Sequence, residues 1–315
     1  MVYLKMVLNE LNSSELSRCA KCGLCLRHCP VYKALLVEKA APRGKIQLLK
    51  AQMEGLVDFT KGMQETFLTC LLCGACTEVC PSDLAPDRIV LKTRQEIVEH
   101  QGLEDRSSSL VSSIATWHNV LGEDNDERGD WAETSLAFLS RSKPLRGAEM
   151  LFFVGCVGSF YPSVQSIPRN VSRILKYAGV SHIILPGDEW CCGFPMINAG
   201  SFSELDKIIK HNSEVVEYFQ PRSILFTCPS CLRMWKDYYN TDIELIHTTE
   251  LMLMRMPGLQ FNFAFGRSVR RKILFDLCCL EHMAGVLSVI HTCILKIHRN
   301  GIKRSLIYDD SKIHS

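Results

Sequence analysis

One cysteine pattern occurs twice within the first 81 residues of this chain. The first copy is CAKCGLCLRHCP at residues 19–30, and the second is CLLCGACTEVCP at residues 70–81. Each copy has the spacing C-x2-C-x2-C-x3-C-P, whose first three thiolates can hold three irons of one [4Fe–4S] cluster. In two-cluster proteins the fourth cysteine of each copy binds the other cluster. The repeated pattern therefore predicts two [4Fe–4S] clusters.

The exchange of fourth ligands determines which cysteines should act together. One cluster is predicted to bind Cys19, Cys22, Cys25 and Cys80, and the other Cys70, Cys73, Cys76 and Cys29. The alternatives are zinc and disulfides. Structural zinc uses pairs of cysteines, and a third cysteine at the same spacing exceeds what a tetrahedral site needs. Two matching sets are better explained by iron–sulfur clusters.

Two cations follow the first copy, Arg43 and Lys45. A cluster with four thiolates is negatively charged, and nearby cations offset that charge and influence its reduction potential. The other interpretation is that both are solvated cations at the start of a helix. The sequence leaves both interpretations open.

The remaining composition limits the location and the partners. The chain has 16 cysteines among 315 residues and no secretory signal at its start, which favours metal ligation in a reducing cytoplasm. Its net charge of +2 indicates no polyanionic partner. Charged residues interrupt the most apolar stretch, 273–295, so any membrane association would be peripheral or through partners. No basic stripe interleaved with aromatic residues indicates nucleic acid. The chain also lacks the glycine-rich motifs of a flavin or dinucleotide site.

The sequence pattern changes near residue 149, after a polar stretch over 101–148 that we interpret as a linker with one or two exposed helices. Short apolar runs at 150–154, 182–185 and 223–227 predict buried strands. Amphipathic stretches follow them at 163–178, 202–219 and 232–239. This alternation predicts a parallel α/β layer.

Five cysteines follow these strands or lie in the loops that lead to the next helix: Cys156, Cys191, Cys192, Cys228 and Cys231. Ligands of open α/β sheets gather beyond the carboxyl ends of the strands, so the five side chains should converge. The alternative is that they are buried free cysteines that serve as small apolar residues. Five thiolates exceed the four positions of tetrahedral zinc. Either one thiol stays free, or the site holds more than one metal ion.

The arrangement of both cysteine runs, a linker, Cys156, Cys191-Cys192-Gly193 and Cys228-x2-Cys231 resembles the CCG-domain iron–sulfur family over roughly residues 15–260. That family includes the iron–sulfur subunits of glycolate oxidase and anaerobic glycerol-3-phosphate dehydrogenase, lactate-utilisation iron–sulfur proteins and a component of heterodisulfide reductase. The resemblance implies that the first domain relays electrons and that the later cysteines bind a further iron–sulfur centre or zinc. It also implies a separate FAD-containing subunit that oxidises the hydroxy acid.

The end of the chain departs from this family. A second CCG repeat is usual there, but Cys278-Cys279 is followed by Leu280 instead of glycine, and no further C-x2-C appears.

Together, these features predict an α+β multidomain chain. It comprises a mostly helical ferredoxin-type domain with two [4Fe–4S] clusters (1–100), a linker (101–148), a parallel α/β CCG domain (149–258) and a truncated or degenerate second CCG repeat (259–315).

We predict from these features an iron–sulfur electron-transfer subunit of a flavoprotein dehydrogenase for a 2-hydroxy acid such as glycolate or lactate, without a substrate site of its own. Electrons would pass through two [4Fe–4S] clusters to a quinone-linked acceptor or another redox protein. One alternative is a disulfide reductase subunit of the heterodisulfide reductase type. Another is a zinc-stabilised docking module fused to a ferredoxin.

Overall fold

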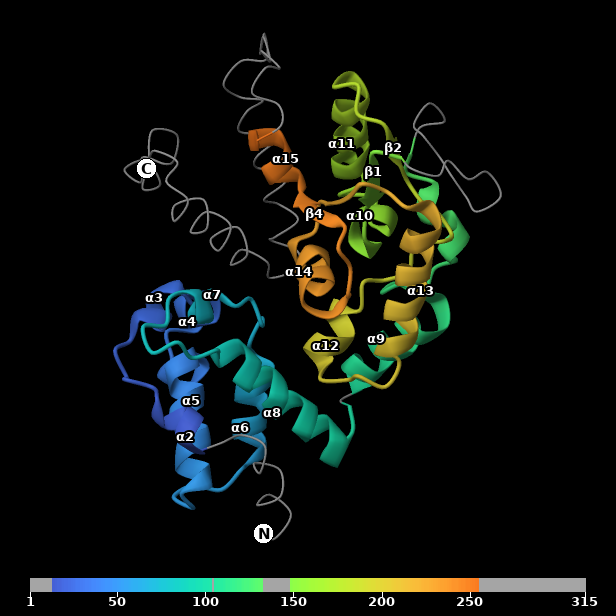
Figure 1. The fold of residues 1–315 in the computed structure, drawn as a ribbon. Coiled ribbons are helices and arrows are strands. Elements are labelled where there is room, and N and C mark those ends of the chain that lie inside the picture. Colours follow the sequence, from blue (N-terminus) through green and yellow to red (C-terminus); the bar gives the residue numbers. More distant parts are fainter. Residues whose placement is uncertain (1–12, 104, 133–147, 255–315) are drawn as a thin grey trace, which may run out of the picture. The chain divides into compact units, whose positions relative to one another are not determined.

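The computed structural model describes residues 13–103, 105–132 and 148–254. The chain forms two compact units, which divide after Val90, within one helix (Figure 1). The predicted second CCG repeat at 259–315 lies outside the described residues, and the predicted domain boundaries stay predictions.

The described part of the first unit is helical, as the sequence predicts. Its elements are α2 (Ser13–Ser17), α3 (Leu24–His28), α4 (Pro30–Leu35), η1 (Glu38–Ala40), α5 (Pro42–Met53), α6 (Lys61–Leu68), α7 (Ala75–Glu78) and the start of α8 (Pro86–Gln101). Proline occupies the first turn of α4 and α5, where no backbone N–H is needed. Leu49 and Phe67 are fully buried and belong to the core that holds these short helices together.

The two cysteine runs have the same backbone shape. Lys21 and Leu72, at equivalent positions, both have positive φ, 55° and 49°. Gly23 and Gly74 follow with φ of 80° and 76°, and each precedes the short helix that carries the third cysteine. This left-handed conformation favours glycine, because a Cβ atom is disfavoured there. The internal repeat in the sequence is thus also a repeat in conformation.

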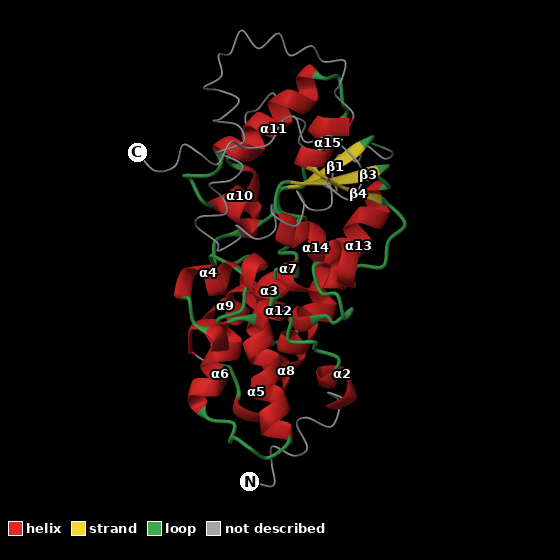
Figure 2. Cartoon of the chain, turned by 90° about the vertical axis from the view of Figure 1, so that its left-hand side faces the viewer, coloured by secondary structure: helices red, strands yellow, loops and turns green. Residues whose placement is uncertain are grey.

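The second unit is built on a parallel sheet, shown in yellow in Figure 2. Its strands are β1 (Met150–Phe153), β2 (His182–Ile183), β3 (Ser223–Phe226) and β4 (Glu244–His247), and they pair in the order β2-β1-β3-β4. The first three strands lie where the apolar runs predict them. The sequence pattern did not indicate β4.

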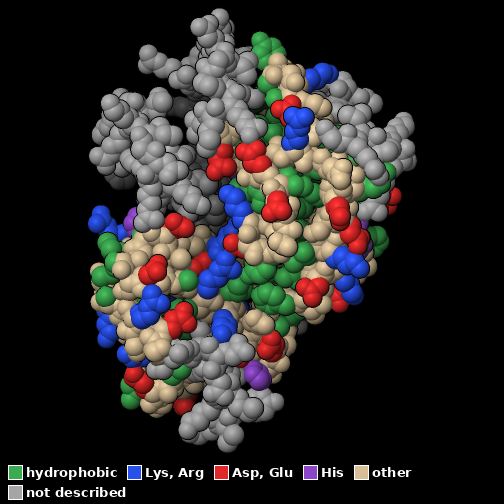
Figure 3. Space-filling view, viewed as in Figure 1, with side chains coloured by type: hydrophobic (Ala, Val, Ile, Leu, Met, Phe, Trp, Pro, Cys, Tyr) green, Lys and Arg blue, Asp and Glu red, His purple; other side chains and the backbone are tan. Residues whose placement is uncertain are grey.

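Helices cover both faces of this sheet. Leu151 and Phe153 of β1 face the cluster that contains α13 (Leu205–Phe219) and α14 (Pro229–Tyr238). Met150 and Phe152 face the cluster formed with α11 (Ser166–Tyr177) and α15 (Thr248–Met254). The outer surface of α13 is polar. Figure 3 shows acidic and basic side chains interspersed there, where Lys207 pairs with Glu204 and Lys210 with Glu214.

Part of the segment interpreted as a linker packs into the second unit. It contains α9 (Asp105–Trp117) and η2 (Asn125–Gly129). Val111 and Ile114 of α9 are buried in one apolar cluster with Cys156 and Cys191. The helical content agrees with the prediction, but one face of α9 is not exposed. The remaining helices of this unit are α10 (Cys156–Phe160) and α12 (Phe194–Ala199). None of the helices in the described ranges combines the length and apolarity that crossing a membrane requires.

Candidate metal centres

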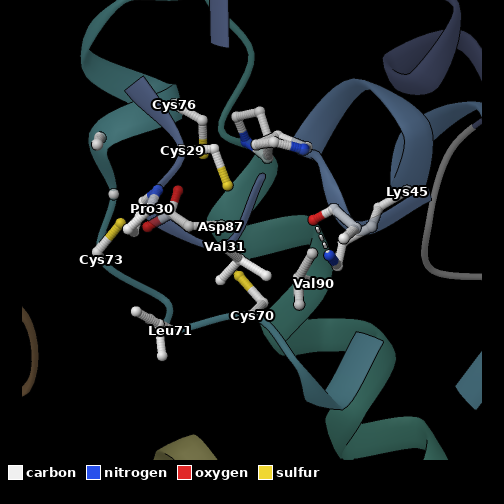
Figure 4. Close-up of a pocket in the computed structure, with 15 residues that line it drawn as sticks. Cys29, Pro30, Val31, Lys45, Cys70, Leu71, Cys73, Cys76, Asp87 and Val90 are labelled. Carbon is white, nitrogen blue, oxygen red and sulfur yellow. Dashed lines mark hydrogen bonds between the residues drawn. The ribbon is translucent and has the colours of Figure 1, made fainter. Parts of the chain in front are cut away.

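The first unit brings one predicted set of cluster ligands to a single pocket. Cys29 of the first run and Cys70, Cys73 and Cys76 of the second run all line it (Figure 4). The Tyr32 N–H donates to Cys29 Sγ at 3.4 Å, and the Leu72 N–H donates to Cys70 Sγ at 3.4 Å. Such donors stabilise a thiolate and affect the potential of the cluster it binds. The grouping fits the predicted exchange of fourth cysteines, and ligation by these residues stays a prediction.

Two charged side chains also line this pocket, Lys45 and Asp87. Lys45 is only 2% exposed and donates from Nζ to the Ala40 carbonyl, so the interpretation as a solvated cation is wrong for this residue. Asp87 is 3% exposed and accepts from the Thr77 hydroxyl. Burial, and then the Asp87 carboxylate, raise the pKa of the Cys76 thiol well above its usual value. The two charges have opposite effects on a bound anionic cluster.

The first run has a different electrostatic partner, Arg43. Arg43 Nη1 donates to the Lys21 carbonyl at 2.9 Å, and Nε pairs with Glu38 at 2.7 Å. Burial raises the pKa of Cys25 to about 11, and a backbone hydrogen bond from Arg43 opposes this rise. Cys19 and Cys22 also lie near enough to raise it electrostatically.

The fourth predicted ligand of that set is Cys80. Arg18 donates to the Ser82 and Asp83 carbonyls at 2.8 and 3.0 Å, which joins the segment before Cys19 to the segment after Cys80. This contact is compatible with the predicted grouping. The assignment of Cys80 to the cluster of the first run stays a prediction.

The second unit brings together the five cysteines that the sequence singles out. Side-chain hydrogen bonds join Cys156 to Cys191, Cys191 to Cys192, Cys192 to Cys231, and Cys231 to Cys228. All are buried except Cys228, which is half-buried. After β1 the chain adds β2 on one side of this strand and β3 on the other, so the direction of the connections changes between β1 and β3. The site lies beyond the carboxyl ends of these two strands. That is the position at which open α/β sheets bind their ligands.

The thiols of this site differ in acidity. Hydrogen bonds from Cys191, and then from Cys231, lower the pKa of Cys192 to about 6. A hydrogen bond from Cys231 lowers the pKa of Cys228 to about 7. The hydrogen bond to Cys191, together with burial, raises the pKa of Cys156 well above its usual value. Because metal ligands are thiolates, thiols that lower one another's pKa are suited to ligation as a group.

The glycine of the CCG sequence has a specific conformational role. Gly193 has φ of 93° and precedes α12, so the chain turns there directly after Cys192. A Cβ atom at this position would lie 2.6 Å from Leu205 Cδ1. We therefore expect Gly193→Ala to destabilise the unit by about 1–3 kcal/mol, because alanine is strained at this φ and displaces Leu205.

Tryptophan fluorescence during urea unfolding measures this effect, since Trp117, Trp131, Trp190 and Trp235 are the four tryptophans of the chain and all belong to the second unit. Gly179→Ala is the matched control. Gly179 also has positive φ, 71°, but no atom lies within 4 Å of the added Cβ. Equal losses in both variants would show that packing against Leu205 contributes nothing.

Several residues around this site carry no sequence signal. Arg128, in the segment interpreted as a linker, donates to Cys156 Sγ at 3.4 Å and pairs with Glu189 at 2.9 Å. Trp190 is stacked between His118 and His211, with ring centroids 3.4 and 3.6 Å apart. The Cys191 N–H donates to the His118 carbonyl at 2.7 Å. A polar stretch with no regular pattern does not indicate which of its side chains pack against a cysteine.

The number and kind of donors distinguish iron–sulfur centres from a single metal ion. Iron–sulfur clusters are bound by cysteine thiolates, and both units offer buried or half-buried groups of four and five thiols. Tetrahedral zinc binds four ligands, so one of the five thiolates of the second unit would be left without a metal. The residues therefore fit iron–sulfur centres better than one zinc ion.

Comparison with known families agrees with this chemistry. Residues 15–84 match the family described as a 4Fe-4S dicluster domain, and residues 150–236 match the family described as a cysteine-rich domain, CCG. The chain is a CCG-domain iron–sulfur protein. The dicluster family implies two [4Fe–4S] clusters in the first unit, as the repeated cysteine run predicts.

Several relatives of this CCG-domain protein are named as oxidoreductases or as their subunits. It is 26% identical to a component of the dihydromethanophenazine:CoB–CoM heterodisulfide reductase of Methanosarcina acetivorans, over 89% of this chain and 72% of the relative. It is 22% identical to a probable glycolate oxidase iron-sulfur subunit of Bacillus subtilis, over 75% of this chain and 62% of the relative. It is 23% identical to EtfAB:quinone oxidoreductase of Syntrophomonas wolfei, over 76% of this chain and 39% of the relative. No solved structure matches the chain.

Proposed function

We propose that this protein is the iron–sulfur electron-transfer subunit of an oxidoreductase complex. The observation that carries the proposal is the pocket in which Cys29 of the first run meets three cysteines of the second. That grouping is the one that two neighbouring [4Fe–4S] clusters require, and such clusters accept and donate single electrons when bound. The chain's own residues exclude water, hold the thiols and set the local charge.

The partner that delivers electrons is proposed to be an FAD-containing dehydrogenase for a 2-hydroxy acid of the glycolate or lactate type. The relative named as a glycolate oxidase subunit supports this choice. The sequence lacks the glycine-rich motifs of a flavin site, so the flavin would belong to the partner. The acceptor would be quinone-linked or another redox protein, and the relative named as an EtfAB:quinone oxidoreductase is consistent with this.

The second candidate function is reduction of a disulfide at the five-cysteine site. Similarity to the heterodisulfide reductase component over 89% of this chain favours it, as does the convergence of five thiols where a sheet binds its ligand. In that reaction one disulfide takes up two electrons and two protons and gives two thiols. The electrons would come from the flavoprotein partner through the first unit.

Metal content and acceptor choice test these functions together. Protein purified without oxygen should contain about eight irons with matching sulfide if only the two clusters are present, and about twelve if the five-cysteine site holds a further centre. The reduced protein is then mixed with menadione or with the CoB–CoM heterodisulfide. Oxidation by the quinone alone supports the electron-transfer subunit, and release of two thiols per disulfide supports the reductase.

Other results would contradict the proposal. Fewer than about four irons per chain would exclude the two-cluster assignment. About eight irons together with one zinc, and no oxidation by either acceptor, would instead support a zinc-stabilised docking module.

A further inference from the structure

A buried cation contacts the five-cysteine site from outside both matched families. Arg128 lies in η2, between residues 15–84 and 150–236, and its side chain is 2% exposed. Its Nη2 donates to Cys156 Sγ at 3.4 Å. A guanidinium cannot lose its proton in a protein, so this contact places a permanent positive charge against one thiol of the site.

The position of this guanidinium is fixed on three further sides. Nη1 donates to Glu189 Oε1 at 2.9 Å, and Nε donates to Asn125 Oδ1 at 3.2 Å. The Phe160 ring centroid lies 5.2 Å from Cζ. Because the guanidinium is rigid and planar, these contacts determine the direction of the N–H that meets Cys156.

Glu189 connects this cation to both loops of the site. Its carboxylate accepts from the Val154 N–H at 2.9 Å and from the Gly155 N–H at 2.8 Å, directly before Cys156. It also lies two positions before Cys191 in the chain. The ion pair therefore joins the loop after β1 to the loop that carries Cys191, Cys192 and Gly193. The guanidinium of the same pair lies against Cys156 Sγ.

We propose that Arg128 is a positioning residue whose guanidinium places a permanent positive charge against Cys156. This charge raises the reduction potential of the iron–sulfur centre that the five cysteines would bind. The inference rests on the proposed presence of that centre. A positive charge stabilises the reduced form, which carries one more electron, relative to the oxidised form. Hydrogen bonds to ligand sulfur act in the same direction.

The test compares two variants that have the same neutral residue at 189. Glu189→Gln retains Arg128, and the double variant Arg128→Met/Glu189→Gln lacks both charges. Neither leaves a buried carboxylate without its cation, but Glu189→Gln leaves the buried guanidinium without its carboxylate, so circular dichroism first confirms that each variant is folded. Each protein, loaded without oxygen, is titrated with dithionite and followed by electron paramagnetic resonance. The iron–sulfur centre at the five-cysteine site is called the third centre, after the two clusters of the first unit. We expect its reduction potential to be lower in the double variant than in Glu189→Gln. The two clusters of the first unit should not change and serve as internal references.

Two further variants separate charge from structure. Arg128→Lys in the Glu189→Gln background keeps the cation and should restore part of the shift. Arg169→Met is the matched control, because Arg169 donates to the Trp131 carbonyl at 2.8 Å and so also anchors the segment that follows η2. The potential of the third centre should not respond to it.

An unchanged potential in the double variant would overturn the role of Arg128, as would an equal shift produced by Arg169→Met. Absence of a third centre from the wild-type protein would overturn the proposed centre itself. The iron content of the wild-type protein distinguishes these failures before any variant is made.

Discussion

Replacement of Cys29 by serine is expected to remove the iron–sulfur cluster of the second run and to leave the cluster of the first run in place. Cys29 belongs to the first run in sequence, but it lines one pocket with Cys70, Cys73 and Cys76. Loss of one of four thiolates should release that cluster, so iron content should fall by about four per chain. Iron and sulfide analysis measures the loss, and electron paramagnetic resonance identifies the remaining cluster.

Cys80→Ser is the matched control, because Cys80 is the fourth cysteine of the other run. It should remove the cluster of the first run and leave the signal that is lost in Cys29→Ser. If each variant instead loses the cluster of its own run, the exchange of fourth ligands does not occur. Loss of both clusters in both variants would indicate that neither cluster is retained without the other.

Arg128→Met alone is expected to destabilise the second unit by about 3–5 kcal/mol. Both side chains of the Arg128–Glu189 pair are 2% exposed, so the variant leaves a buried carboxylate without its cation. The Val154 and Gly155 N–H donors remain, but they do not supply a full compensating charge. Urea unfolding followed by tryptophan fluorescence measures the loss, since all four tryptophans lie in this unit.

The double variant Arg128→Met/Glu189→Gln is the control for this prediction. Replacing both partners of a buried ion pair is often close to neutral, so most of the lost stability should return. A double variant as unstable as Arg128→Met would show that packing of the Arg128 side chain matters more than the unpaired charge. A fully stable single variant would contradict the prediction, because Glu189 would then tolerate burial without its partner.

Most of the first unit was predictable from local sequence. Spacing alone selected the eight cysteines as predicted ligands, because three ligands of each cluster fall within one short loop and that loop repeats. Four of the eight line one pocket in the structure. The buried state of Lys45 was not predictable. Lysine is usually exposed, and only the packing of α5 shows that its Nζ reaches the Ala40 carbonyl.

The second unit was predictable as far as its strands are apolar. Runs such as the one at 150–154 indicate a buried parallel strand, and the positions of the cysteines after such strands indicate where they meet. Strand β4 was missed because its burial changes along its length, from exposed Glu244 to buried His247. Arg128 was missed because one charged residue in a polar segment has the same pattern whether it faces solvent or sulfur.

The packing of residues 105–132 against the five-cysteine site bears on how the chain can be divided. A fragment beginning at residue 149 would include every predicted ligand of that site and the whole matched cysteine-rich family. It would nevertheless lack Arg128, the His118 carbonyl that binds the Cys191 N–H, and the buried face of α9. The smallest portable form of this site is therefore expected to begin near residue 91, where the second unit starts, and any transplant into another protein should include α9.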